Sequence, residues 1–318
     1  MQLKKASTLA LRDFMGLVEE ETLLVISDEN MREIGLALYE SGQKLGGEAY
    51  YFEMPVGKVS GEEPPEPVGE MMKTVDVVVI PTTHSYTHTK ARRQATKLGV
   101  RVGTMPGITP DTMVRCFNAD YERIVETTDK LTELLRRTNE VHVTTDLGTD
   151  ITISLRGRRV VGSSGVMRKI ASSGNLPSGE VSFALIEDKT NGIIVFDGAM
   201  GGMATIENPV TVEIEDGKAV KFSGSGGEAR VLSRLINRYG DYGKVLAEYG
   251  IGTNYKAEIT GEILEDQKIL GMSHFGFGNN LMLGGKNKVP IHIDGVVKDA
   301  TVYADGKLIV DRGEAVFI

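Results

Sequence analysis

Short, nearly continuous apolar runs alternate with amphipathic segments through the first 110 residues. The runs that predict strands lie at residues 23–27, 49–54, 75–81 and 100–105. The third, VDVVVIP, is apolar at nearly every position, which is typical of a parallel strand covered on both faces. Helical spacing of apolar residues follows the first run at residues 31–45 and the third at residues 87–98. The alternation predicts a doubly wound α/β domain built on a parallel sheet.

Near residue 140 the pattern changes to an alternation of apolar and polar residues, which favours half-buried strands. Residues 140–161 read as a β-hairpin around Gly148. Further strands are expected at residues 181–186, 192–196, 210–215, 219–223, 289–297, 300–303 and 307–310. Helical spacing is clear at residues 228–238 and weaker at 263–269. We therefore predict an α/β domain at residues 1–138 and a β-rich α+β domain at 139–318, with a helix at residues 121–137 that joins the two or belongs to the first.

Composition and charge exclude several classes of protein. The net charge of −8 argues against a protein that binds nucleic acid by neutralising phosphates. The one cysteine, Cys116, excludes an internal disulfide and a cysteine-based zinc cluster, and its helical setting predicts a buried apolar role. No apolar stretch approaches the ~18 residues of a membrane span, and Arg12 and Asp13 interrupt the N-terminal apolar run where a signal peptide needs its core. We expect a cytoplasmic protein without membrane partners.

Glycine is the outlier of the composition, with 38 residues among 318. The expected nucleotide-binding patterns are nevertheless missing, because residues 28–30 after the first strand read DEN and no phosphate-binding loop of the form GxxxxGK[ST] occurs. No GxSxG turn for a serine hydrolase occurs either. The remaining candidate chemistry is that of a metal site.

Histidines and carboxylates next to glycines supply the candidate ligands. In PIHIDGVV, His292 and Asp294 share one face of an extended strand, where they can hold a metal ion or form a hydrogen-bonded pair on a solvent face. His274 lies in GMSHFGFGNN, Glu180 in NLPSGEV and Glu248 in AEYGIGTN. All five border glycines, which we expect to form sharp turns that bring the side chains together. Two imidazoles and three carboxylates suit one or two divalent first-row metals.

These blocks, in their order and spacing over residues 140–318, resemble the metal-binding half of the thermophilic metalloaminopeptidases, the aminopeptidase T and aminopeptidase S group. The stretch THSYTHTKARRQATKLGVRVGTMPGIT at residues 83–109 resembles the N-terminal domain of that family more weakly. The resemblance implies an α/β domain followed by a β-rich domain, usually in a homodimer. It also implies a leucyl aminopeptidase-like hydrolase of peptides, with two Zn, Co or Mn ions held by the five residues just named. This hydrolase is our main hypothesis.

One departure from the family pattern brings in another reaction class. The family has a tyrosine shortly after the first metal-binding histidine, whereas residues 275–283 read FGFGNNLML, with Leu281 near the expected position. In a hydrolase, Asn279 or Asn280 would then have to supply the missing hydrogen bond to the substrate. The same fold also resembles 2,5-dihydroxypyridine 5,6-dioxygenase, a ring-opening iron(II) enzyme. This second resemblance implies one Fe(II) rather than two hydrolytic ions.

The dioxygenase hypothesis assigns the same residues differently. His274, His292 and Asp294 would form the two-histidine, one-carboxylate triad of non-haem iron, and Glu180 and Glu248 would face the substrate or support the ligands. His88 becomes an acid–base candidate at the carboxyl end of strand 75–81, where open α/β sheets bind ligands, or is a plain residue at the start of the next helix. A metal-binding homologue without catalysis is the third hypothesis.

Overall fold

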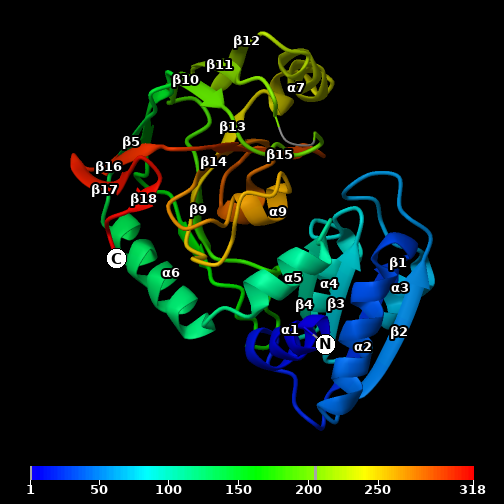
Figure 1. Cartoon of the computed structure of the whole chain (residues 1–318). Coiled ribbons are helices and arrows are strands. Elements are labelled where there is room, and N and C mark those ends of the chain that lie inside the picture. Colours follow the sequence, from blue (N-terminus) through cyan, green and yellow to red (C-terminus); the bar gives the residue numbers. More distant parts are fainter. Residues whose placement is uncertain (1, 204–205) are drawn as a thin grey trace. The chain divides into compact units, whose positions relative to one another are not determined.

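The computed structural model describes residues 2–203 and 206–318 and shows a chain of mixed α/β structure. Contacts divide it into two compact units, the residues up to Arg123 with Ser164–Ser178, and Ile124–Ser163 with Gly179–Ile318. One unit is built on a parallel sheet and the other on antiparallel sheets (Figure 1). The predicted fold class is confirmed, while the boundary at residues 138/139 stays a prediction.

The first unit holds a five-stranded parallel sheet in the order β2-β1-β3-β4-β8. Its strands are β1 (Thr22–Asp28), β2 (Glu48–Met54), β3 (Val77–Thr82), β4 (Arg101–Pro106) and β8 (Ser173–Asn175). β3 is buried at every position, as its apolar run predicts. β8 was not predicted, because three residues that pair with a strand far away in sequence leave no periodic signal.

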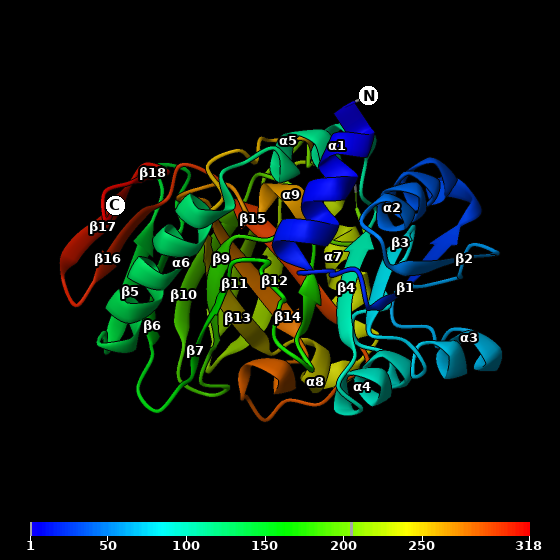
Figure 2. The same ribbon diagram turned by 90° about the horizontal axis from the view of Figure 1, so that it is seen from below.

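Helices cover both faces of this sheet, with α1, α2 and α5 on one face and α3 and α4 on the other (Figure 2). The helices are α1 (Gln2–Leu9), α2 (Arg32–Lys44), α3 (Glu66–Met71), α4 (Lys90–Lys97) and α5 (Pro110–Phe117), with a π-helical turn at Ala10–Phe14 and a 3-10 turn at Glu29–Met31. Thr89 and Thr109 cap α4 and α5 by accepting the backbone N–H three residues ahead. Cys116 is buried in α5, as predicted.

The second unit contains two antiparallel sheets. The eight-stranded sheet has the order β12 (Lys218–Ser223), β11 (Val210–Glu215), β10 (Asn191–Phe196), β6 (Asp150–Ser154), β5 (Glu140–Thr144), β16 (Thr301–Ala304), β17 (Lys307–Asp311) and β18 (Glu314–Ala315). The five-stranded sheet has the order β15 (His292–Val297), β14 (Ser273–Gly278), β13 (Leu246–Gly252), β9 (Glu180–Ala184) and β7 (Val160–Ser163). The helices are α6 (Tyr121–Arg136), α7 (Glu228–Asn237), α8 (Gly240–Gly243) and α9 (Ile263–Asp266), with a 3-10 turn, η3, at Leu281–Leu283.

One hydrophobic core lies between the two sheets. Phe196 of β10 meets Phe275 and Phe277 of β14 edge to face, with ring centroids 6.4 and 6.0 Å apart. Leu131 and Leu135 of α6 belong to the same core. These contacts occupy one side of the five-stranded sheet, which we call its core face.

Two strands of this sheet, β13 and β14, lie where the glycine-rich blocks predicted sharp turns. That prediction was wrong for Gly250 and Gly276, which lie inside the strands. Glycine is depleted in strands, so local pattern alone does not identify a strand that contains several of them.

The helices among the described residues are too short or too polar to span a lipid bilayer.

Candidate metal centre

The five predicted ligands lie on one face of the five-stranded sheet. Glu180 opens β9, Glu248 lies in β13, His274 in β14, and His292 and Asp294 in β15. Because side chains alternate along a strand, the strand register places all five opposite the core face. We call this side of the sheet the site face.

Each ligand-type residue pairs with a glycine on a neighbouring strand. The pairs are Glu180 with Gly252, Glu248 and Asp294 with Gly276, His274 with Gly250, and His292 with Gly278. A Cβ at Gly276 would lie 2.6 Å from Asp294 Oδ1 and 3.1 Å from the His292 ring, and one at Gly250 would collide with the His274 ring. The glycines therefore leave room for long polar side chains to lie across the sheet toward one another.

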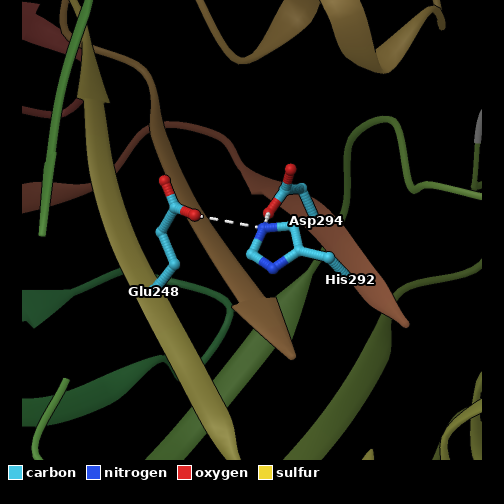
Figure 3. Close-up of side chains that lie close together, drawn as sticks. All are labelled: Glu248, His292 and Asp294. Atoms are coloured by element: carbon cyan, nitrogen blue, oxygen red, sulfur yellow. Dashed lines mark ion pairs between the residues drawn. The ribbon is translucent and has the colours of Figure 1, made fainter. Parts of the chain in front are cut away.

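Three of the side chains converge most closely (Figure 3). Glu248 Oε2 and Asp294 Oδ1 each lie 3.0 Å from Nε2 of His292. One ligand atom from each of the three residues lies within 4.8 Å of the others, a spacing that a single metal ion can bridge. The neighbouring carbonyl of Asn279 accepts a hydrogen bond from His292 Nδ1 at 2.7 Å, which orients the ring with Nε2 toward the carboxylates.

The charges of this cluster are strongly coupled. Burial by itself lowers the pKa of His292, but the negative charges and hydrogen bonds of Asp294 and Glu248 raise that pKa well above its ordinary value. Burial by itself raises the pKa of Glu248, but the interactions with His274 and His292 hold it well below its ordinary value. Two carboxylates around one imidazole therefore form a site that attracts a cation.

His274 and Glu180 extend the cluster along the site face. His274 Nε2 lies 3.8 Å from Glu248 Oε1 and 3.6 Å from Glu180 Oε2. The imidazole is fully buried, and neither of its ring nitrogens has a hydrogen-bond partner in the described part of the chain. A buried polar group without a hydrogen-bond partner is costly, so the two ring nitrogens of His274 fit a residue that binds a metal ion.

The other predicted site residues lie outside this cluster. Both asparagine side chains hold the loop after β14, since Asn279 Nδ2 donates to the Val289 carbonyl at 3.0 Å and Asn280 Nδ2 donates to Glu187 at 3.0 Å. The structure shows a role for Asn279 that the sequence did not suggest, the orientation of His292 through its carbonyl.

His88 is exposed in the loop between β3 and α4 of the parallel-sheet unit. It lies just before Thr89, the N-cap of α4, in the connection that follows β3, a place that fits both readings of this residue. The roles of His88, Asn279 and Asn280 stay predictions.

Sequence reasoning missed Lys268, a fully buried lysine whose Nζ lies 2.5 Å from Glu180 Oε2. The neighbouring Gln267 donates a longer hydrogen bond of 3.4 Å to the same oxygen. The signal was available in ILEDQKIL, where four consecutive polar residues lie between apolar ones, but the weak helical spacing of that stretch concealed it.

Comparisons with known proteins separate the two reaction classes. The chain matches the family described as NicX, 2,5-dihydroxypyridine 5,6-dioxygenase, over residues 14–317. It is 26% identical over 263 residues to the 2,5-dihydroxypyridine 5,6-dioxygenase of Pseudomonas putida, covering 77% of this chain and 72% of that protein.

Two solved structures share the fold. The dihydroxypyridine dioxygenase of P. putida matches with a TM-score of 0.85 at 20% identity, covering 99% of this chain and 96% of that one. AmpT of Thermus thermophilus matches with a TM-score of 0.75 at 17% identity, covering 99% of both chains. The resemblance to the aminopeptidases is thus one of fold.

The hydrolase hypothesis was therefore wrong, and with it the description of the protein as an aminopeptidase or protease. The physical reason is that ligand-type residues on a sheet face suit metal chemistry of either class, so they do not identify the reaction. Leu281, where the aminopeptidase pattern has a tyrosine, was the position that argued against a hydrolase. It lies in η3, is 44% exposed, and has no group that could hydrogen-bond a substrate. Matched over nearly its whole length, the chain belongs to the 2,5-dihydroxypyridine 5,6-dioxygenase family.

Proposed function

We propose that this protein is a metal-dependent dioxygenase that opens the ring of a dihydroxypyridine between carbons 5 and 6. The observation that carries the proposal is the cluster of Glu248, His292 and Asp294, extended by buried His274, in a chain that belongs to this family. The reaction consumes one O₂ and places both oxygen atoms in the ring-opened product, so it needs no external reductant.

The donor set fits a single ferrous ion, since two imidazoles and a carboxylate with open positions are typical of iron(II) oxygenases. His274, His292 and Asp294 would hold it, and Glu248, which groups closely with His292 and Asp294, would lie next to the ion. When bound, the ion supplies redox chemistry with O₂ that no side chain of this protein provides. Zn, Co and Mn, the ions expected for the hydrolase, are then substitutes whose activity is to be compared with that of Fe(II).

The chain's own residues would orient and polarise the substrate. Glu248, whose Oε2 lies 3.0 Å from His292 Nε2, contributes a carboxylate that can accept a hydrogen bond from a ring hydroxyl next to the ion. Glu180, whose Oε2 lies 3.6 Å from His274 Nε2, would accept a second hydrogen bond from the substrate. The hydrogen bond from His292 to the Asn279 carbonyl keeps the imidazole in place as the substrate enters. His88 is our acid–base candidate, and the homodimer implied by the first resemblance stays a prediction.

An anaerobic preparation tests the proposal. The apoprotein is loaded with Fe(II), its metal content is measured, and O₂ uptake is followed with 2,5-dihydroxypyridine and with isomers that carry the hydroxyls elsewhere. We expect about one iron per chain and stoichiometric O₂ uptake with the 2,5 isomer. Hydrolysis of leucine p-nitroanilide by protein loaded with Co(II), Zn(II) or Mn(II), without O₂ uptake, would contradict it. His88→Ala tests the acid–base assignment, which fails if kcat is unchanged.

A further inference from the structure

A run of four consecutive polar residues is buried beside the candidate metal centre. Glu265, Asp266, Gln267 and Lys268 are each at most 7% exposed, at the end of α9 and in the turn that follows it. The two acids hold the preceding loop, since Asp266 accepts hydrogen bonds from the backbone of Thr260 and Gly261 and Glu265 accepts one from the backbone of Glu258. Lys268 instead reaches the site face.

Three side chains converge on one oxygen of Glu180. Lys268 Nζ lies 2.5 Å from Oε2, Gln267 Nε2 lies 3.4 Å away and His274 Nε2 lies 3.6 Å away. Among the described residues, Lys268 forms its ion pair with Glu180. A buried ammonium is costly unless it is paired, so the two charges depend on each other.

The backbone leaves Lys268 little freedom to move. Its carbonyl accepts a hydrogen bond from the Asn254 N–H at 2.8 Å, and Leu270 N–H donates to the Asn254 carbonyl at 3.1 Å. Gly252, at the end of β13, packs so tightly against this turn that a Cβ there would lie 2.5 Å from the carbonyl carbon of Lys268. β13, the strand that carries Glu248, therefore also fixes the backbone from which the Lys268 side chain extends.

We propose that Lys268 is a positioning residue, which balances the charge of Glu180 and fixes its carboxylate beside His274 so that it can accept a hydrogen bond from the substrate. Without the ammonium, repulsion from the neighbouring carboxylate of Glu248 displaces Glu180 from that place. This inference rests on the proposed function for the nature of the substrate. The geometry of Glu180 itself can be tested without turnover.

The test compares Lys268→Met, Glu180→Gln and the double variant, with Lys221→Met as control, because Lys221 forms an exposed ion pair with Glu213 in the same unit. Co(II) is titrated into each apoprotein anaerobically, and its visible spectrum and affinity are recorded. We expect Co(II) to bind all four, with the same spectral change in Lys268→Met and in Glu180→Gln and none in the control. With Fe(II), we expect kcat to fall about 100-fold in both single variants, and the double variant to be no slower than Glu180→Gln.

Folding is monitored in parallel. Removing one charge of a buried pair is expected to lower Tm by about 5 °C or more in Lys268→Met, while removing both restores much of it. Lys268→Arg keeps the charge and should retain more of kcat than Lys268→Met. If the double variant recovers Tm but loses kcat by the product of the two single effects, or if Lys268→Met leaves both spectrum and kcat unchanged, the inference is wrong. If the wild type shows no O₂ uptake but Lys268→Met still changes the Co(II) spectrum, the proposed function is wrong and the inference about Lys268 stands.

Discussion

Strands β3 and β14 are both six residues long and buried at every position, yet they are buried for different reasons. β3 reads VVVIPT and is covered by apolar side chains and helices on both faces of its sheet. β14 reads SHFGFG, with Phe275 and Phe277 on the core face and with His274 and glycines on the site face. Complete burial in β3 serves stability, whereas in β14 it serves stability on one face and brings polar groups together on the other.

Loss of a ligand from the site face, which β14 shares with β15, should give the largest effect. His292→Ala removes the imidazole between Glu248 and Asp294, and we expect metal affinity to fall by more than about 100-fold, with loss of turnover. Metal content after gel filtration measures the effect. His142→Ala is the control, because this histidine pairs with Asp150 on the other sheet. Full metal content in His292→Ala would remove the site assignment.

A methyl group on the site face should act through the ligands alone. Gly276→Ala places a Cβ 2.6 Å from Asp294 Oδ1, so we expect metal affinity to fall about 10- to 100-fold while the sheet still forms. Isothermal titration with Co(II) gives the affinity and circular dichroism checks the fold. Gly227→Ala is the matched control, since nothing lies within 4 Å of its Cβ and its φ is −80°. Equal affinities for the two variants would contradict the role of the glycines.

A cavity in β3 should give the opposite result. Ile80 is 2% exposed in the core of the parallel-sheet unit, and Ile80→Ala is expected to cost about 2–5 kcal/mol of unfolding free energy. Metal affinity at 25 °C should be unchanged for the folded protein. Urea titration measures the first quantity and Co(II) titration the second. A loss of metal affinity without a loss of stability would show that burial in β3 serves the site.

The smallest expected effect concerns a buried acid next to β10. Burial raises the pKa of Asp197, although the Lys298 N–H donates to its carboxylate at 2.8 Å. Because the folded pKa exceeds the unfolded one, this group favours folding at acid pH, and that contribution is lost as pH rises through the folded pKa. Asp197→Asn should remove this pH dependence and leave stability near neutral pH no lower than that of the wild type. Urea midpoints measured at a series of pH values from about 3 to 7, which starts below the ordinary pKa of an aspartate, test it, and an unchanged pH dependence in the variant would contradict it.

How well the sequence predicted each region depends on the same difference between β3 and β14. Four of the five parallel strands, β1 to β4, were predicted to within one or two residues, because apolar residues that pack against helices leave a continuous run in the sequence. β13 and β14 were not predicted as strands, because the glycines that make room for ligands remove the apolar alternation from the site face. The ligand-type residues were nevertheless found, since rare histidines and repeated carboxylate–glycine pairs stand out without any knowledge of the strands.

By itself the sequence determined the two-part α/β and β-rich plan and the five polar residues suited to a metal, because these depend on local periodicity and residue type. Only the tertiary structure decided that the five share one sheet face, that each lies opposite a glycine, and that Lys268 reaches Glu180. Strand register and the burial of a charge arise from contacts between segments distant in the chain. No local pattern of residues contains that information.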